Sequence, residues 1–366
     1  MLSDPLSLTI PFDHVPAVPV GPTRKLLTPS SSHPDDYILE IDYSSISDFT
    51  RCPRASENKL VFSREANRDT AATSFGRLFH ECEELRLRHG YSDAVRQRQA
   101  ELVMNHFLRY SVGAGEYRTG DRMLEVLKQY NERYKDDRWP ESVLQVEGEP
   151  FVERAFKVPL CTVPVEARAP YQTGQIVKYE QGLPWEPDET EGGTFLRNIH
   201  VVFTGRIDAV LTQGEALWVI DHKTSSRGGK EFQEAFFLSS QTRGYTWAAQ
   251  QLLGTPVSGL IMNAVVVRPL TKTGTGTEFD RHTYHYTPDS LEEWRENMVA
   301  TMTDFISCLV RGFFPQSARS FKSPCAGCDY QDNYRLPRAQ RTADLASDLF
   351  RDCTWNPIDL GEGGVA

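Results

Sequence analysis

Apolar residues recur every three or four positions in the N-terminal third of the chain, a period that predicts amphipathic helices. In the stretch 73–89 this apolar stripe consists of Phe75, Leu78, Cys82 and Leu85. Gly90 follows it as a helix stop. The same period predicts helices over about 92–111 and 119–136, and serines that can cap a helix predict another start within 42–59.

Beyond residue 142 the period changes to two, which is typical of β-strands. Strands are predicted at 143–156, 201–211, 217–224, 260–267 and 279–286. Helices are predicted at 231–253 and 288–313, and a long loop at 170–199, which is rich in glycine, proline and acidic residues. This order predicts an α/β fold: a central mixed β-sheet flanked by helices, with an N-terminal helical subdomain and a Cys-bearing C-terminal segment.

These patterns divide the chain into four parts. Residues 1–36 contain seven prolines and are expected to form an extended or disordered arm. Residues 37–140 are expected to form the helical subdomain, which carries Cys52 and His80. Residues 141–315 are expected to form the core that contains the sheet, and 316–366 the Cys-bearing segment with a polar tail.

Composition excludes several classes of protein. The chain has 366 residues, of which 39% are hydrophobic and 25% charged, as in globular proteins. Its apolar runs are too short to span a membrane, and the lack of an export signal after Met1 predicts a cytoplasmic protein. No P-loop motif occurs. Seven cysteines, an odd number, favour free thiols or a metal site over a disulfide framework.

The net charge of −10 excludes a uniformly basic coat, but it is compatible with a local basic groove. Residues 51–100 contain ten Lys and Arg against seven Asp and Glu, and residues 311–341 contain six against two. These local excesses of +3 and +4 are consistent with a phosphate-binding surface. Arg51 and Arg54 are the better candidates for phosphate contact. A solvated helix face is the expectation for Arg86, Arg88, Arg96 and Arg98.

Two of the predicted strands are joined by a short turn at Gly214. Such a turn places Asp208 opposite Asp221, with Lys223 two residues further along on the same face. Converging carboxylates favour a divalent cation, and oxygen ligands select Mg²⁺ or Mn²⁺. The alternative is a surface hairpin with these side chains in solvent. The apolar run 217–220 favours a central strand, in which unpaired carboxylates are costly.

Four sequence motifs follow one another across residues 76–245. They are Gly76-x-x-x-His80, Gly205-x-x-Asp208, Asp221-x-Lys223 and Gln241-x-x-x-Tyr245. In this order, on a helix, a hairpin and a following helix, they resemble the PD-(D/E)XK nuclease superfamily. The resemblance is to its RecB-like branch, with AddB-type, CRISPR-adaptation-type and phage-encoded exonucleases. It implies that residues 141–315 form a PD-(D/E)XK nuclease core with a restriction-endonuclease-like sheet.

The resemblance also implies a role for each motif residue. The metal ligands would be His80, Asp208, Asp221 and the backbone carbonyl of His222. Lys223 would position or activate the attacking water, and Gln241 and Tyr245 would contact DNA or support the site. Gly76 lies one turn before His80 and would leave room for a ligand. Taken singly, His80 also fits a half-buried histidine, and Tyr245 fits plain core packing.

A Cys-x-x-Cys pair, Cys325 and Cys328, is typical of half of a metal or cluster site. The resemblance implies an iron–sulfur staple that joins this pair to a cysteine in a Cys-Pro context, which Cys52 matches. The fourth ligand departs from the family pattern, and Cys353 is the remaining downstream candidate. A [4Fe–4S] cluster on these four thiolates is preferred, with Zn²⁺ or unconnected thiols as alternatives. Ordinary buried or partly buried cysteines are expected at Cys82, Cys161 and Cys308.

These features predict a metal-dependent deoxyribonuclease that hydrolyses phosphodiester bonds with a Mg²⁺- or Mn²⁺-activated water. The resemblance favours an exonuclease at free DNA ends, in recombination, repair or phage DNA processing, over an endonuclease. It implies a helicase or recombinase partner and no membrane. Arg51, Arg54, Gln241 and Tyr245 would bind DNA. Two alternatives are a cluster-stabilised DNA-binding subunit of a larger recombination or packaging complex without cleavage activity, and a zinc-bound structural scaffold.

Overall fold

The structure is a computed structural model. It describes residues 26–31, 36–66, 71–109, 113, 115–168, 194–270, 276–311, 313–317, 325 and 327–353. Most of the predicted arm, residues 1–25 and 32–35, lies outside the described residues, as does most of the predicted loop 170–199. Within the arm, strand β1 (Leu27–Pro29) pairs with the next strand and buries Leu27, so this stretch is part of the sheet.

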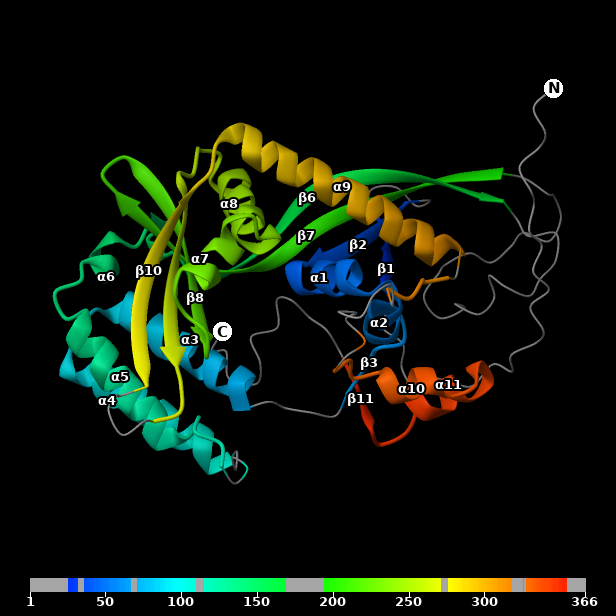
Figure 1. The fold of residues 1–366 in the computed structure, drawn as a ribbon. Helices are drawn as coiled ribbons and strands as arrows, with labels where there is room; N and C mark the ends of the chain where they lie inside the picture. Colours follow the sequence, from blue (N-terminus) through cyan, green and yellow to red (C-terminus); the bar gives the residue numbers. More distant parts are fainter. Residues whose placement is uncertain are drawn as a thin grey trace.

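A seven-stranded mixed sheet forms the centre of the molecule (Figure 1). The strand order is β1-β2-β7-β8-β9-β10, and β6 pairs with β7 outside this order. Besides β1 the strands are β2 (Tyr37–Asp42), β6 (Val152–Arg168), β7 (Thr194–Gln213), β8 (Ala216–Ser225), β9 (Gly259–Val267) and β10 (Thr277–His285). The predicted fold class, a central mixed sheet flanked by helices, is confirmed.

The long strand β7 changes partners along its length. β6 follows one of its edges, while β2 and β8 share the other edge. β2 runs parallel to β7 and ends at Asp42, opposite Thr204, whereas β8 runs antiparallel and pairs from Ala209 onward. The segment 205–208 therefore lies between these two partners, where β8 leaves β7 and continues beside β9. This fork in the sheet is where the candidate site forms.

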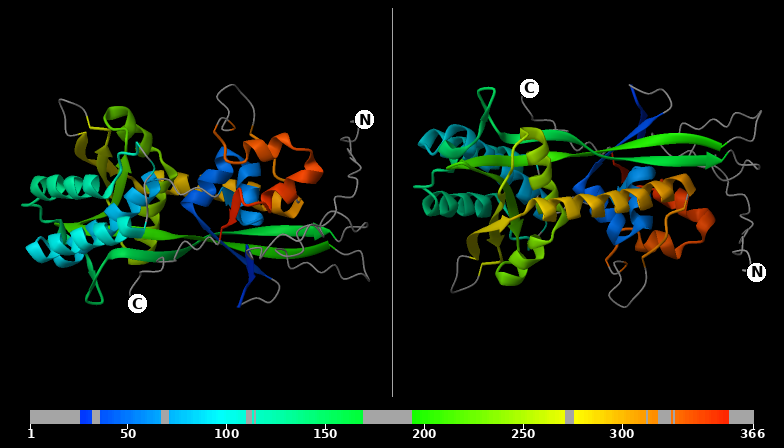
Figure 2. Two further views of the ribbon diagram at one scale, coloured as in Figure 1. Left: turned by 90° about the horizontal axis from the view of Figure 1, so that it is seen from below. Right: turned by 90° about the horizontal axis from the view of Figure 1, so that it is seen from above.

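Helices cover both faces of the sheet (Figure 2). One face carries α1 (Tyr43–Arg51), α8 (Ser240–Leu253) and α9 (Pro288–Arg311). The other carries α3 (Ala71–His89), α4 (Asp93–Arg109), α5 (Gly120–Arg133) and α6 (Trp139–Ser142). β9 is buried along its whole length because alternate residues, such as Met262 and Val265, enter the cores on opposite faces. Among the helices of the described residues, none is long and apolar enough to cross a membrane.

Three predicted elements have different bounds in the structure. The predicted helix 231–253 is two helices, α7 (Lys230–Phe237) and α8, because Ser239 takes an extended conformation and caps α8 through the amide of Gln241. The predicted strand 143–156 is divided into β4 (Gln145–Val146), β5 (Glu149–Pro150) and the start of β6. The predicted loop 170–199 is too long, since β7 begins at Thr194.

Short elements from both ends of the described chain form a unit beside the sheet, which we call the cysteine module (residues 52–66 and 325–353). It contains α2 (Pro53–Ser56), the π-helix Glu57–Val61, β3 (Arg64–Ala66), α10 (Gln331–Arg335), α11 (Arg338–Leu345) and β11 (Phe350–Asp352). β3 and β11 pair antiparallel, and Cys52 packs with Tyr330 and Phe350. Cys52 thus lies with the C-terminal segment, while the helix that carries His80 packs on the sheet.

Candidate active site

Three neighbouring strands each place one carboxylate at the fork. Glu153 of β6 lies opposite Asp208 of β7, because the residues on either side of them are paired. Asp208 in turn lies level with Asp221 of β8, one step beyond the pair of Ala209 with Ile220. Asp208 and Asp221 are 7% and 1% exposed. The hairpin therefore has the register that its turn predicted, and its two aspartates are buried rather than in solvent.

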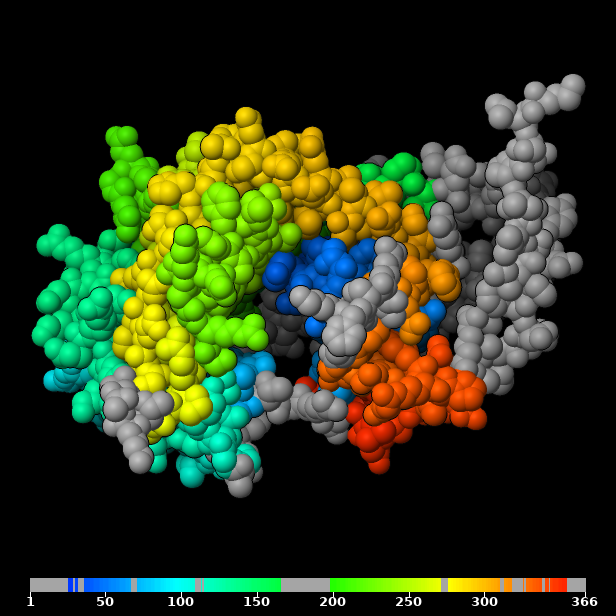
Figure 3. Space-filling view, in the orientation of Figure 1, coloured from blue at the N-terminus to red at the C-terminus, as the bar shows by residue number. Residues whose placement is uncertain are grey.

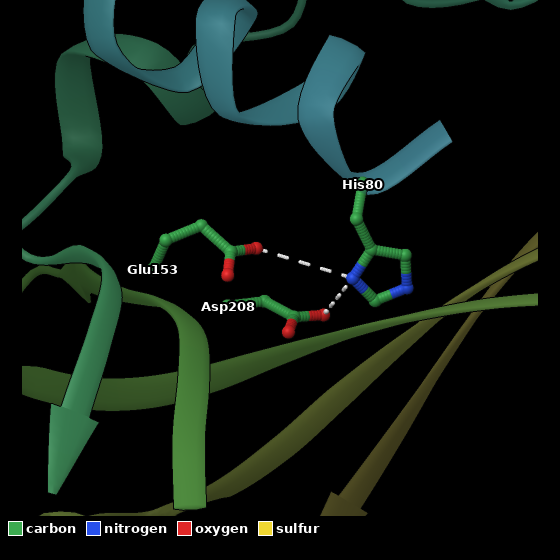
Figure 4. Close-up of side chains that lie close together, drawn as sticks. All are labelled: His80, Glu153 and Asp208. Carbon is green, nitrogen blue, oxygen red and sulfur yellow. Dashed lines mark ion pairs between the residues drawn. The ribbon is translucent and has the colours of Figure 1, made fainter. Parts of the chain in front are cut away.

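α3 carries His80 above this row of carboxylates (Figure 4). The Nδ1 atom of His80 lies 3.4 Å from Oδ2 of Asp208 and 3.9 Å from Oε1 of Glu153. One ligand atom from each residue falls within 4.8 Å of the others, the one such group of His, Cys, Asp and Glu side chains that the described residues contain. This arrangement can hold a metal ion.

Gly76 sets how closely α3 approaches the sheet. A Cβ atom at this position would lie 2.8 Å from Oγ1 of Thr224 on β8, closer than side-chain atoms pack. The absence of a side chain thus lets the helix lie against β8, which brings His80, one turn later, over the carboxylates. The sequence analysis expected Gly76 to leave room for a ligand. In the structure that room is taken by Thr224.

Asp221 and Lys223 form an ion pair at the same fork. The Nζ atom of Lys223 lies 2.8 Å from Oδ1 and 2.7 Å from Oδ2 of Asp221. Gln241, in the first turn of α8, donates from Nε2 to Oδ1 of Asp221 over 3.2 Å. The Gln241 side chain also hydrogen-bonds Tyr245 one turn later, whose ring packs on Phe156. The structure thus brings the hairpin motifs and the Gln-x-x-x-Tyr motif together.

The electrostatics of the site reflect this crowding of carboxylates. Burial would lower the pKa of His80, but the neighbouring Asp208 carboxylate outweighs it and raises this pKa to about 9. Burial would raise the pKa of Asp208, but His80 holds it below its ordinary value. Burial, and then repulsion from Asp208, raise the pKa of Glu153 to about 8. Were all three carboxylates ionised, they would carry one more negative charge than His80 and Lys223 balance, so Glu153 keeps its proton more readily than an ordinary glutamate, even with Arg206 3.8 Å away.

His222, between the two motif residues of β8, fixes Asp208 from behind. Its backbone amide donates to Oδ2 of Asp208 over 2.6 Å. Its Nδ1 accepts a hydrogen bond of 2.8 Å from the Asn263 amide, which also donates to the hydroxyl of Tyr130 over 2.7 Å. Burial lowers the pKa of His222 to about 3, so the ring is neutral and can accept from Asn263.

A buried ion-pair network continues from Tyr130 beneath α3. Arg281 lies 2.9 Å from Asp137 and donates to Tyr130, and Arg86 bridges Asp137 to Glu83. Arg86 is 1% exposed, so the expectation that it lies on a solvated helix face is wrong. Its guanidinium is buried because the carboxylates of Glu83, on α3, and of Asp137, two residues before α6, neutralise it there. The network ties α3, α5 and β10 together behind the site.

The two arginines expected to contact DNA lie near the start of the cysteine module. Arg51 ends α1, is 64% exposed on its side chain and pairs with Asp48. Arg54 pairs with the buried Glu57, and its guanidinium lies over the ring of Phe313. Arg54 is therefore mostly engaged in internal contacts, whereas Arg51 faces solvent.

The four proposed cluster cysteines are all free thiols in the cysteine module. Cys52 and Cys328 belong to one hydrophobic cluster with Tyr330. Burial raises the pKa of the Cys328 thiol, against a backbone hydrogen bond from Tyr330, and the neighbouring Cys52 and Cys325 add to the rise. Cys353 donates its amide to the Ser63 carbonyl over 2.8 Å, at the end of the β3–β11 pair.

Glu153 is the site residue that sequence reasoning missed. The sequence predicts a strand over 143–156, in which a single glutamate is expected to face solvent. In the structure Glu153 has a φ of +50°, which turns its side chain away from the regular alternation of β6 and toward Asp208. The sequence offered little signal, since Glu153 stands beside Arg154 between Val152 and Phe156, as charged residues do in an ordinary half-exposed strand.

The forked sheet and its row of carboxylates define an α/β protein with an acidic site on adjacent central strands. A family model described as the PD-(D/E)XK nuclease superfamily matches residues 41–333, and the chain belongs to this superfamily. The match covers the helix of His80, the whole sheet from β6 onward and most of the cysteine module. The predicted membership of the superfamily is thereby confirmed.

Comparisons with individual proteins add only distant similarities. No curated protein sequence matches the chain. A crystal structure from Eubacterium rectale, described as a "putative exonuclease", is similar with 12% identity and a TM-score of 0.42, over 82% of this chain and 89% of that chain. The structure of SSO0001 is similar with 12% identity and a TM-score of 0.26, over 82% of this chain and 86% of that chain. Neither similarity carries an argument about function.

Proposed function

We propose that this chain is a Mg²⁺- or Mn²⁺-dependent deoxyribonuclease of the RecB-like branch that degrades DNA from free ends. The observation that carries the proposal is the row of Glu153, Asp208 and Asp221 on three adjacent strands, with His80 above it and Lys223 beside it. Membership of a nuclease superfamily supports the same chemistry. The segment 205–208, which carries Asp208, pairs with neither β2 nor β8 among the described residues.

The donor set at the fork fits a hard divalent cation. Nδ1 of His80 and carboxylate oxygens of Glu153 and Asp208 lie within 4.8 Å of one another, and oxygen-rich sets suit Mg²⁺ and Mn²⁺. Asp221 and the backbone carbonyl of His222 would complete the shell from β8. When bound, such a cation supplies Lewis-acid stabilisation of the negative charge that develops on the phosphoryl group.

Lys223 is placed to orient the attacking water. Both oxygens of Asp221 hold its ammonium group, which has three N–H donors and so can also donate to a water at the fork. The water oxygen then forms a bond to phosphorus and loses a proton to solvent, the bond from phosphorus to the leaving oxygen breaks, and the leaving oxygen takes up a proton from solvent. Gln241 steadies Asp221 from α8, and burial keeps Tyr245 protonated, so that its hydroxyl can donate to a phosphate oxygen or to Gln241.

We further propose that Cys52, Cys325, Cys328 and Cys353 hold a [4Fe–4S] cluster that staples the two ends of the cysteine module. The packing of Cys52 and Cys328 in one hydrophobic cluster, and the effect of Cys52 and Cys325 on the Cys328 thiol, support a shared metal or cluster site. A [4Fe–4S] cluster is preferred to a single Zn²⁺ ion because the resemblance to the RecB-like branch implies it.

The resemblance to the RecB-like branch favours a substrate with free ends, and a helicase or recombinase that exposes such ends would be the natural partner. Arg51, which faces solvent between α1 and the cysteine module, would contact the phosphate backbone, and Arg54 would support that surface. Recombination, repair and phage DNA processing are the settings that require such an enzyme.

The test is cleavage of three end-labelled or stained substrates by the purified full-length chain: linear duplex, linear single strand and covalently closed circle. Mn²⁺ or Mg²⁺ is expected to support loss of the linear substrates, and EDTA to prevent it. Asp221→Asn and Lys223→Ala are each expected to reduce the rate by a factor of about 10² or more. Lys157→Ala is the matched control, because Lys157 is an exposed lysine of the same sheet that pairs with Glu40.

Each outcome decides a part of the proposal. Nicking of the closed circle would identify an endonuclease and overturn the preference for free ends. Cleavage that survives Asp221→Asn would place the active site elsewhere. DNA binding without cleavage in either metal would favour the non-cleaving, cluster-stabilised subunit.

A further inference from the structure

The break between α7 and α8 presents two large apolar side chains to solvent. Phe237, the last residue of α7, is 51% exposed, and Leu238, the linker residue, is 66% exposed. α7 has no buried residue, although Phe232 and Phe236 rest against the core. Two adjacent exposed apolar side chains at a helix end are costly in water, so they point to a role in contact with something else.

The backbone that carries these side chains is held rigidly. Three successive carbonyls are tied by side chains: that of Phe236 accepts from Thr242 Oγ1 over 2.8 Å, and that of Phe237 from the Tyr286 hydroxyl over 3.1 Å. The carbonyl of Leu238 accepts from the Arg243 guanidinium over 3.0 Å. A loop that is only a connection has no need of this fixation. Rigid presentation of a ring is what a stacking contact requires.

The exposed pair lies close to the cleavage site. Phe237 precedes Gln241, which donates to Asp221, by four residues, so their Cα atoms are at most about 15 Å apart. The Phe237 ring stacks on Tyr286 and also contacts Tyr284. Figure 3 shows the lime-green atoms around α7 at the rim of a hollow, across from the blue atoms of α1.

We propose that Phe237 and Leu238 form a platform on which an unpaired base of the DNA strand stacks, beside the phosphate that is cleaved. The inference rests on the proposed nuclease function and describes how the enzyme binds the strand that it cleaves. The exposed face of the Phe237 ring, backed by Tyr286, offers the base a flat apolar surface.

A base fits this surface better than the phosphate backbone does. α7 carries Glu231 and Glu234 but also Lys230, which pairs with Glu234. Asp280 of β10 accepts from Gln233, and Arg243 donates to the Leu238 carbonyl, so positive charges around the platform do not exceed negative ones and no excess cation is there to hold a phosphate. Stacking on an uncharged ring depends neither on those charges nor on the identity of the base, which suits an enzyme that degrades DNA of any sequence. The phosphates would instead follow the Lys223 side of the fork.

The experiment compares two substrates of one enzyme in Mn²⁺. The first is a single-stranded oligonucleotide with 2-aminopurine near its end, and the second is an oligonucleotide of the same length built from abasic tetrahydrofuran residues, which has phosphodiesters but no aromatic ring. Phe237→Ala is expected to lower kcat/KM on the oligonucleotide about tenfold or more and to remove the quenching of 2-aminopurine on binding. Phe237→Trp is expected to restore both. Hydrolysis of the abasic oligonucleotide is expected to stay within twofold of the wild type for each variant.

Leu252→Ala is the matched control, because Leu252 is an exposed apolar residue at the far end of α8, 42% exposed. Leu238→Ala serves as the second variant if Phe237→Ala lowers the melting temperature. Equal losses on both substrates, or no loss on the oligonucleotide, would overturn the platform. If the wild type hydrolyses neither substrate, the nuclease proposal fails instead, and the quenching of 2-aminopurine by the same variants still decides the platform.

Discussion

Glu153 and Asp208 lie opposite each other on antiparallel strands, yet neither belongs to the regular ladder that continues on both sides of them. Glu153 has a φ of +50°, a conformation that non-glycine residues rarely adopt. The Val152 carbonyl before it accepts a hydrogen bond of 2.7 Å from Arg88 of α3. The helix that carries His80 therefore also fixes the strand that carries Glu153, and the strained backbone directs this carboxylate to the same point as Asp208.

Glu153→Gln is expected to reduce metal-dependent cleavage at least tenfold and to raise the Mn²⁺ concentration needed for half-maximal activity. The amide keeps the shape of the side chain but carries no charge, so the cation loses one anionic ligand. A titration of activity against Mn²⁺ measures both effects. Glu149→Gln, an exposed glutamate of the neighbouring β5, is the control. An unchanged Mn²⁺ dependence in Glu153→Gln would exclude Glu153 from the metal site.

Gly76→Ala is expected to destabilise the fold by about 1–3 kcal/mol and to reduce cleavage, because its Cβ would meet Oγ1 of Thr224 at 2.8 Å. The helix would shift away from β8 and carry His80 with it. Removing the hydroxyl in the double variant Gly76→Ala/Thr224→Ala is expected to recover most of both losses. Urea unfolding and the cleavage rate are measured on Gly76→Ala, Thr224→Ala and the double variant. Additive losses in the double variant would contradict a direct contact.

The sequence predicted those parts of the site that depend on local rules. A two-residue turn at Gly214 fixes the hairpin register, and with it the level of Asp208 and Asp221. The helical period places His80 off the apolar stripe of α3. Both inferences need only the spacing of residues along one element.

The features that were not predicted depend on contacts between distant segments. Glu153 reaches the site only through a positive φ that Arg88 helps to hold, and the buried Arg86 pairs not only with Glu83 of its own helix but also with Asp137, 51 positions further along the chain. The break at Ser239 is held by Thr242 and Tyr286, which bond the carbonyls before it, although the two serines at 239 and 240 were a local cap signal. Tertiary contacts decide such cases, and a single sequence does not reveal them.

Arg86→Met is expected to lower the free energy of unfolding by about 3–5 kcal/mol, because the buried Glu83 would lose its partner. The double variant Glu83→Gln/Arg86→Met removes both charges and is expected to recover a large part of that loss. Chemical denaturation followed by circular dichroism measures each variant. If the double variant is as unstable as the single one, packing of the Arg86 side chain, and not the charge left on Glu83, is the dominant contribution.

The cysteine module is expected to depend on its cluster for stability, because β3 and β11 are three residues each and the buried contacts around Tyr330 are few. Protein purified without oxygen is expected to be brown and to contain iron and sulfide. Cys328→Ser is expected to lose the colour and to lower the melting temperature. Cys161→Ser, in β6 of the central sheet, is expected to change neither.

Cys353→Ser tests the ligand that departs from the family pattern. Its amide is bonded to Ser63 at the end of β3, so the backbone already holds this cysteine in the module and its sulfur needs only to reach the cluster. Loss of iron in Cys353→Ser equal to that in Cys328→Ser would make it the fourth ligand. Full iron content would mean that another group completes the cluster. A colourless wild type that contains zinc would replace the cluster by a single ion, and a wild type with neither metal would leave the thiols unconnected.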